Sequence, residues 1–227
     1  MPQPRTQAKR LTDKVNSFFK NKVDLVTGSS HGLGLEIAKV LSQKGVIVYL
    51  NGRSSFEVNH NTKNLNRINK ARVFSAVGDI SREVNVKKII EKIKYKHHRL
   101  DFLINNAGSY DSKKFINTDY QELMKNMSVN LLSHLHLTLL AVKLMKKNNF
   151  GRIVNISSGS GVHGGILPSF GYALSKNSLI FMPKILAKEF KDEDITFNAF
   201  ILRFMRTRMF EKFKEYNIPI SDVDHVS

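Results

Sequence analysis

The chain has 227 residues, enough for one α/β domain with a large buried core and too few for two domains of ordinary size. It contains no cysteine, which excludes disulfide bonds, thiol nucleophiles and thiolate metal sites and fits a reducing cytosol. Lysine and arginine total 36 against 19 aspartates and glutamates, a net charge of +17. This charge favours polyanions, but it is diffuse and no motif of a nucleic-acid-binding module accompanies it, so we expect no specific nucleic-acid site.

Residues 1–17 form a basic segment with a single acid. The segment lacks the apolar centre of a secretory signal, and we interpret it as a disordered arm before one domain at residues 18–227. A mitochondrial presequence is the alternative, but the segment has little serine, so we expect a cytoplasmic protein. The longest apolar runs are interrupted by His134, His136 or Lys143 before they reach about 18 residues, and we expect no membrane span.

Short apolar runs alternate with segments of helical periodicity. Strands are predicted at residues 23–27, 46–50, 73–77, 101–105, 152–156 and 195–201. The helices that we can bound from the periodicity lie at residues 33–43, 84–95, 120–146 and 172–190. This alternation predicts an α/β fold: a Rossmann-like doubly wound parallel sheet of six strands with helices on both faces and right-handed crossovers.

Polar residues follow five of the predicted strands in turn. They are Gly28, Arg53, Asp79, Asn105 and Ser158. In sheets of this kind ligands bind outside the carboxyl ends of the strands, where the strand order reverses. The sequence therefore predicts one ligand site at this edge of the sheet.

The first of these positions opens a glycine-rich turn, with glycines at 28, 32 and 34 between a strand and a helix. Glycine permits a tight turn there and lets backbone N–H groups approach a pyrophosphate at the positive end of the helix. A plain strand-to-helix corner is the alternative reading.

Tyr172 and Lys176 are four residues apart in a predicted helix, fourteen residues after Ser158. Positions i and i+4 share a helix face, so the ammonium can lie beside the phenol and favour its ionised form. This pair predicts an acid/base tyrosine that works near neutral pH.

Together with Asn105-Asn106-Ala107-Gly108, these motifs resemble the short-chain dehydrogenase/reductase family, in particular its 3-oxoacyl-(acyl-carrier-protein) reductases. The resemblance runs from about Phe19 to Met209 and implies catalytic roles for Asn130, Ser158, Tyr172 and Lys176. Tyr172 would exchange a proton with the substrate oxygen, Ser158 would hydrogen-bond that oxygen, Lys176 would hold the nicotinamide ribose, and Asn130 would anchor a water.

The serine assignment has alternatives, because the family usually places its serine one residue closer to the tyrosine. Ser157 and Ser160 are nearby. We keep Ser158 for its expected spacing from Asn130, and interpret residues 162–170 as containing one added residue.

The resemblance also implies a set of cofactor-binding residues. They are Gly28, Ser30, His31, Gly32, Leu33, Gly34, Arg53, Asp79, Ile80, Asn106, Ala107, Gly108, Tyr172, Lys176 and Thr207. No carboxylate follows the second strand, and the Arg53 fork can hold a 2′-phosphate, so NADP(H) is favoured over NAD(H). A solvated surface arginine is the alternative for Arg53. The histidines have no metal-ligand spacing, and we expect no metal.

The C-terminal end departs from the family pattern. Leu202-Arg203 stands where the family has Pro-Gly beside the nicotinamide, and the chain stops soon after Val223, without the usual seventh strand. We expect an atypical, shortened end.

The sequence favours an NADP(H)-dependent oxidoreductase that interconverts a carbonyl and a secondary alcohol, on a small substrate that an acyl carrier protein could carry. Resemblance implies a homo-oligomer through the helices at 120–146 and 172–190. Two alternatives stay open: a catalytically degraded homologue that binds a nucleotide or a partner protein, and a polyanion-binding module driven by charge.

Overall fold

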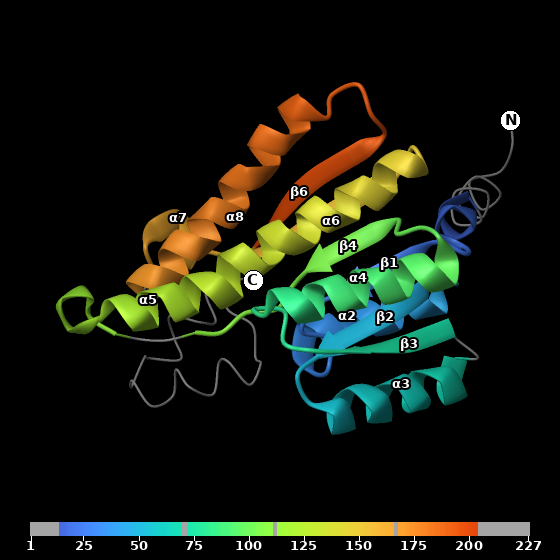
Figure 1. Ribbon diagram of the computed structural model, residues 1–227, viewed down its shortest axis with the longest axis horizontal. Coiled ribbons are helices and arrows are strands. Elements are labelled where there is room, and N and C mark those ends of the chain that lie inside the picture. The colour runs from blue at the N-terminus through green and yellow to red at the C-terminus, as the bar shows by residue number, and fades with distance from the viewer. Residues whose placement is uncertain (1–13, 70–71, 111–112, 166–167, 204–227) are drawn as a thin grey trace, which may run out of the picture.

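A computed structural model describes residues 14–69, 72–110, 113–165 and 168–203 (Figure 1). Its six strands form one parallel sheet in the order β3-β2-β1-β4-β5-β6. They are β1 (Val23–Val26), β2 (Ile47–Gly52), β3 (Arg72–Val77), β4 (Phe102–Asn105), β5 (Gly151–Ser158) and β6 (Ile195–Leu202). The predicted doubly wound sheet is confirmed, with its order reversing between β1 and β4.

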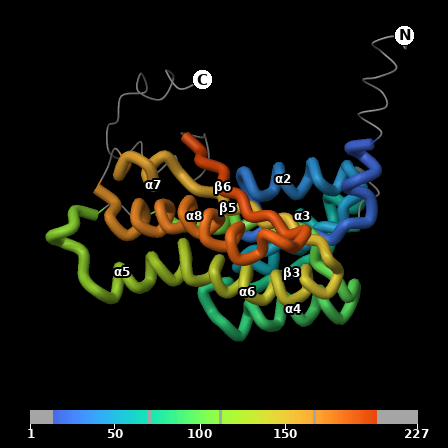
Figure 2. Tube along the Cα trace, turned by 90° about the horizontal axis from the view of Figure 1, so that it is seen from above, coloured from blue at the N-terminus to red at the C-terminus, as the bar shows by residue number. Residues whose placement is uncertain are grey.

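Helices cover both faces of the sheet, with α2 and α4/α6 on opposite sides (Figure 2). One face carries α2 (Gly32–Gln43) and α3 (Ser55–Asn69), and the other carries α4 (Glu83–His97), α5 (Tyr120–Met127), α6 (Ser133–Lys147) and α8 (Phe170–Glu189). Two short helices complete the described elements: the 3-10 turn η1 (Phe115–Asn117) and α7 (Ser160–His163). Because both sheet faces are covered, β1 and β2 are buried along their whole length.

The predicted elements are found within a few residues of their bounds, with two differences. Helix α3 was not bounded from the sequence, because its composition is polar and only Val58 and Leu65 of its apolar residues are buried. The predicted helix at 120–146 is divided by a π-helical turn, η2 (Ser128–Leu132). One extra residue in this turn breaks the 3.6-residue period on which the prediction of a continuous helix rested.

The last residues of the predicted basic arm are helical. Residues 14–19 are helical, whereas the sequence predicted disorder to residue 17; residues 1–13 lie outside the described part. The cause is aromatic packing: the Phe18 ring lies 5.8 Å from that of Phe150, and the Phe19 ring lies 5.8 Å from that of Phe102. These contacts bury apolar surface that the sequence analysis assigned to no element.

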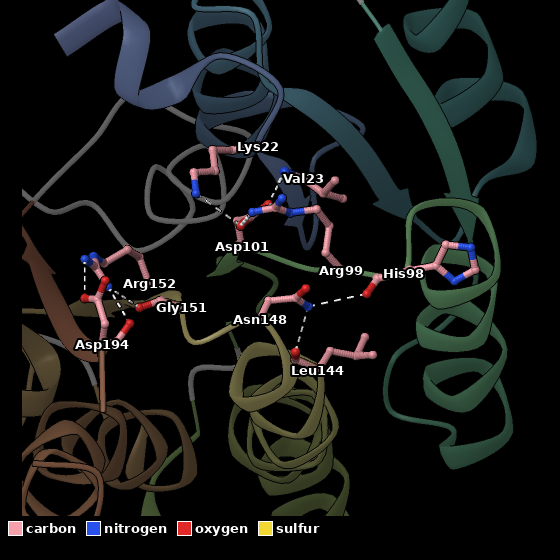
Figure 3. A network of polar contacts seen from close by, with 10 residues as sticks. All are labelled: Lys22, Val23, His98, Arg99, Asp101, Leu144, Asn148, Gly151, Arg152 and Asp194. Carbon is pink, nitrogen blue, oxygen red and sulfur yellow. Dashed lines mark hydrogen bonds and ion pairs between the residues drawn. The ribbon is translucent and has the colours of Figure 1, made fainter. Parts of the chain in front are cut away.

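A polar network holds the amino ends of the strands, opposite the predicted ligand site (Figure 3). The buried Asp101 carboxylate accepts the backbone N–H of Val23 at 2.8 Å and forms ion pairs with Arg99 and Lys22. At the other side of the network Arg152 pairs with Asp194 at 2.6 Å. These contacts connect β1, β4, β5 and the start of β6 at the amino ends of the strands, where no ligand site is predicted.

Asp24 breaks the apolar pattern of β1. Its side chain is completely buried, and no described residue gives either carboxylate oxygen a hydrogen bond of ordinary geometry. Burial raises the pKa of Asp24 well above its usual value, partly offset by the nearby Leu25 N–H, and the Asp101 charge raises it further. The folded protein therefore favours the neutral form of this carboxyl.

The continuous helical run Tyr120–Lys147 is long and apolar enough to cross a membrane by length and composition. Half of its apolar window is nevertheless buried inside the domain. Leu137, Ala141 and Met145 are fully buried in the core beside the sheet, so packing within the domain accounts for the apolar character of this run.

Candidate active site

The glycine-rich turn lies at the carboxyl end of β1, at the point where the strand order reverses. Gly28 and Gly32 have φ angles of +61° and +58°. Residues other than glycine adopt such backbone angles only at an energetic cost. A Cβ on Gly32 would meet nothing within 4 Å, so the start of α2 is open to a ligand. This is the cradle that a pyrophosphate requires, and the predicted turn fits a bound dinucleotide.

The turn after β4 packs directly against the glycine turn. Asn106 Nδ2 donates to the carbonyls of Thr27 at 2.8 Å and Gly28 at 3.2 Å. The Thr27 hydroxyl accepts the N–H groups of Asn106 and Ala107 at 2.9 and 3.0 Å. Asn106 and Ala107 are thereby held against the glycine turn, and a role for them and for Gly108 in cofactor binding stays a prediction.

The adenosine end of the predicted site is formed by the residues after β2 and β3. Burial alone would raise the pKa of Asp79, but hydrogen bonds from Ser81 and the charges of Arg53 and Arg82 together lower it. Arg53 is exposed and close enough to Asp79 to act on it. Two arginines, Arg53 and Arg82, therefore act on Asp79, and the sequence analysis had singled out only Arg53.

His31 links the glycine turn to α3. Its Nδ1 lies 3.0 Å from the Ser30 hydroxyl and 3.8 Å from a carboxylate oxygen of Glu57. Glu57 is thus an acid near the same region, and the sequence analysis did not consider it. Leu33 and Gly34 lie in the first turn of α2. The Ile80 side chain packs in the hydrophobic core.

Tyr172 and Ser158 come together across the carboxyl end of β5. The Tyr172 side chain is buried at the start of α8, where Ser158 is close enough to act on its pKa and the Tyr110 ring packs edge-on at 5.1 Å. Burial raises the pKa of Tyr172, the nearby Ser158 hydroxyl lowers it, and Tyr110 raises it again. The net shift is upward, so the expected net lowering by Lys176 is not found in the protein alone.

Lys176 is buried one turn further along α8. Its Nζ donates to the Ile156 carbonyl at 2.8 Å and lies 5.7 Å from the centre of the Tyr172 ring. Burial lowers the pKa of Lys176 to about 8. A Cβ added to Gly108 would lie 3.6 Å from Nζ, so the ammonium faces the turn after β4.

The neighbouring serines are engaged elsewhere. Ser157 is buried, and its hydroxyl donates to the Lys176 carbonyl at 2.7 Å. Ser160 lies at the start of α7, and its N–H donates to the Ser158 hydroxyl at 3.2 Å. Of the three serines, Ser158 is the one whose hydroxyl reaches Tyr172.

Asn130 lies in the π-helical turn η2 and is fully buried. Its side-chain amide donates to the Ser109 carbonyl at 2.9 Å and accepts the Ser109 N–H at 2.8 Å. A π-turn inside a helix often marks a functional position. Here it places Asn130 against the turn after β4, and a Cβ on Gly108 would lie 3.1 Å from its Oδ1.

Two features at the end of β6 remain. Arg203 is exposed, immediately after β6, whose Leu202 carbonyl accepts the Gly159 N–H at 2.8 Å. Thr207 lies outside the described residues. No group of three or more potential metal ligands occurs among the residues that the structure describes.

Three polar residues that the sequence analysis did not single out complete the site. Asn51 donates its N–H to the Ser29 hydroxyl at 2.9 Å, Thr27 binds the turn after β4, and His134 binds the Ala107 carbonyl at 2.8 Å. Only His134 had a recognisable signal: it is four residues after Asn130 and therefore on the same helix face.

A sequence model of the short chain dehydrogenase family matches residues 22–217. The chain is 30% identical over 197 residues to a 3-oxoacyl-(acyl-carrier-protein) reductase of Thermotoga maritima, covering 87% of this chain and 79% of the relative. It is 32% identical to the enzyme of the same name from Aquifex aeolicus, covering 84% and 77%.

A solved structure of actinorhodin polyketide ketoreductase with NADPH superimposes with a TM-score of 0.82 at 27% identity, covering 91% of this chain and 78% of that one. L-sorbose reductase from Gluconobacter frateurii, in complex with NADPH and L-sorbose, shares the fold at a TM-score of 0.76, 23% identity and coverage of 79% and 68%. The chain belongs to the short-chain dehydrogenase family and is an oxidoreductase of the carbonyl/alcohol class.

Proposed function

We propose that the protein uses NADP(H) to interconvert a carbonyl and a secondary alcohol, with Tyr172, Ser158, Lys176 and Asn130 as its functional set. The observation that carries the proposal is the closeness of Ser158 to the buried Tyr172 phenol, whose pKa it lowers, with the Lys176 ammonium 5.7 Å from the centre of the ring and the open glycine turn at the same sheet edge. This arrangement supports an acid and a hydrogen-bond donor that act beside a dinucleotide.

In the reducing direction Tyr172 donates its proton to the carbonyl oxygen as negative charge develops there, and Ser158 donates a hydrogen bond to the same oxygen. When bound, NADPH supplies the hydride that the carbonyl carbon accepts. The resulting alcohol carries one hydride and one proton, and the tyrosinate left behind is stabilised by the Lys176 charge until it takes a proton from solvent. Oxidation reverses these steps.

The upward pKa shift of Tyr172 in the protein alone is compatible with this mechanism. A phenol of raised pKa stays protonated at neutral pH and is ready to donate. Lys176 then acts when the tyrosinate forms, because an ammonium stabilises a neighbouring anion more strongly in a buried site than in water.

Arg53 and Arg82 support the choice of NADP(H), since both act on Asp79 at the adenosine end of the site. Glu57 lies on the same side, 3.8 Å from His31 Nδ1, and counts against a 2′-phosphate. Both structural neighbours described above were solved with NADPH. We expect Arg53→Asp to shift preference towards NADH; unchanged preference would remove Arg53 from cofactor selection.

The proposal extends to a small carbonyl substrate that an acyl carrier protein could present, as the names of the curated relatives suggest. The chain's positive charge suits an acidic carrier. A cytoplasmic location belongs to the same proposal.

We further propose self-association through the long helices. Exposed apolar side chains lie on α6 at Leu135 and Leu139 and on α8 at Phe181 and Ile185. A second copy would cover them.

The decisive experiment is NADPH oxidation by Tyr172→Phe against a panel of carbonyl compounds. We expect activity to fall by about 10²-fold or more while NADPH affinity stays within about twofold, because the phenol transfers the proton and contributes little to binding. Tyr95→Phe, on the exposed side of α4, is the matched control and keeps full activity. Parent-like activity in Tyr172→Phe would refute the mechanism, and NADPH binding without any turnover by the parent would favour a degraded, nucleotide-binding homologue.

A further inference from the structure

His134 is a fully buried polar residue that the proposed reaction does not use. It lies on α6, one helical turn after Asn130, and its Nε2 is 2.8 Å from the Ala107 carbonyl. A carbonyl can only accept, so Nε2 carries the proton and donates. Nδ1 is then a bare acceptor, and no described residue donates to it.

The imidazole stays neutral across the physiological range. Burial is the main cause that lowers the pKa of His134 to about 3, the Lys176 ammonium lowers it further, and the hydrogen bond to Ala107 works in the opposite direction. The lysine that the reaction uses is thus near enough to His134 to act on its charge. A neutral imidazole can donate and accept at once, which an imidazolium cannot do.

A second buried acceptor lacks a partner among the described residues. Asn105 Oδ1 is unpaired, whereas its Nδ2 donates to the Thr138 hydroxyl at 3.1 Å and to Asn155 Oδ1 at 2.9 Å. Thr138 is one helical turn after His134, so the face of α6 that carries His134 also contacts Asn105. The Lys176 ammonium, which gives one of its three protons to the Ile156 carbonyl, is near enough to His134 for its charge to act on the imidazole.

The Ala107 carbonyl, to which His134 donates, belongs to the turn after β4. This turn lies between the glycine turn and Lys176. Ala107 packs so closely on the glycine turn that a Cβ on Gly28 would lie 2.8 Å from its Cα. The next residue, Gly108, faces Lys176. Any shift of Ala107 therefore changes both the cradle for the pyrophosphate and the space in front of the ammonium.

We infer that His134 is a positioning residue for cofactor binding and turnover. Its Nε2–H fixes the Ala107 carbonyl, so that the turn after β4 stays seated between the glycine turn and Lys176, and its Nδ1 keeps an acceptor in the buried surroundings of that lysine. The role of His134 in turnover rests on the proposed function. Its effect on the turn after β4 rests on the fold alone.

The test compares His134→Phe with His134→Gln. Phenylalanine fills the space but leaves the Ala107 carbonyl unpaired, whereas glutamine restores a donor near Nε2 and an acceptor. Ser133→Ala is the matched control, because the buried Ser133 hydroxyl donates to the Val129 carbonyl within its own helical run and does not touch the turn. Each variant is measured for amide exchange at Asn106 and Ala107 without cofactor, for NADPH affinity by fluorescence, and for kcat and KM.

In His134→Phe we expect the two amides to exchange at least about tenfold faster and NADPH to bind about tenfold more weakly, with kcat also lower. His134→Gln should recover most of each loss, and Ser133→Ala should change none of them. Unchanged exchange at Asn106 and Ala107 in His134→Phe, or a glutamine variant as impaired as the phenylalanine one, would overturn the inference. If the parent itself fails to bind NADPH, the proposed function fails, and the exchange rates still decide the role of His134.

Discussion

Replacing Asp24 by alanine should stabilise the protein at neutral pH. The carboxyl is completely buried in β1, its two oxygens have no hydrogen-bond partner among the residues that the structure describes, and burial raises its pKa. An unsatisfied buried polar group costs about 1–3 kcal/mol, and the small void left by alanine offsets part of that gain. We therefore expect a net increase of about 1 kcal/mol in the free energy of unfolding, which is about 2–4 °C in Tm for a chain of this size.

The pH dependence gives the sharper form of this prediction. The folded-state pKa of Asp24 is raised above the unfolded value of about 4, so neutral Asp24 is favoured in the folded protein. The parent therefore loses stability as pH rises from about 4 towards the folded-state pKa, by up to about 1.4 kcal/mol per pH unit. Asp24→Ala and Asp24→Asn remove this loss, so their advantage over the parent should grow with pH.

Urea unfolding at several pH values between 4 and 8, analysed for the free energy of unfolding, measures both effects. Asp101→Asn is the control, because that buried carboxylate is paired with Arg99 and Lys22 and its loss should destabilise the protein. An Asp24→Ala variant that is less stable than the parent at pH 7, with an unchanged pH slope, would refute the reasoning.

Two further predictions concern the site. A Cβ on Gly34 would lie 2.5 Å from Asn106 Nδ2 and 2.7 Å from the Gly28 carbonyl, so Gly34→Ala should weaken NADPH binding by about tenfold or more in a fluorescence titration. Gly32→Ala meets no atoms and should show only the cost of its positive φ, about 1–2 kcal/mol in unfolding experiments. Because burial lowers the pKa of Lys176 to about 8, kcat/KM for reduction should be level below that pH and fall as pH rises through it; a profile flat to pH 10 would contradict a role for the ammonium.

The sequence predicts the sheet better than it predicts the detailed arrangement of the site. The doubly wound parallel sheet could be predicted, because apolar runs of strand length alternate with helical periods. Polar residues follow five of the six predicted strands, and a ligand site at that edge of the sheet stays a prediction. The pairing of Ser158 with Tyr172 also fitted the sequence, although three serines competed for it. The π-turn at Asn130 could not be predicted, since local spacing there is compatible with one continuous helix.

The pKa shifts could not be predicted from the sequence for a different reason. Tyr172 was expected to have a net lowered pKa from its neighbouring lysine, yet burial dominates and raises it. Asp24 lies in an ordinary strand pattern, and nothing local to it shows that both oxygens lack a partner. Desolvation depends on what other segments cover a side chain, so these shifts follow from the packed fold alone.

By itself, the sequence determined the alternating α/β pattern, the glycine turn and the tyrosine–lysine pair, because each is a local property of spacing and residue type. The tertiary structure decided which side chains face one another across that pattern: Asn106 against the glycine turn, His134 under the Ala107 carbonyl, and Arg82 with Arg53 around Asp79. Asn106 and Thr27 are 79 positions apart, Ala107 and His134 are 27 apart, and the arginine charges act on Asp79 through space. One-dimensional spacing carries no information about such contacts.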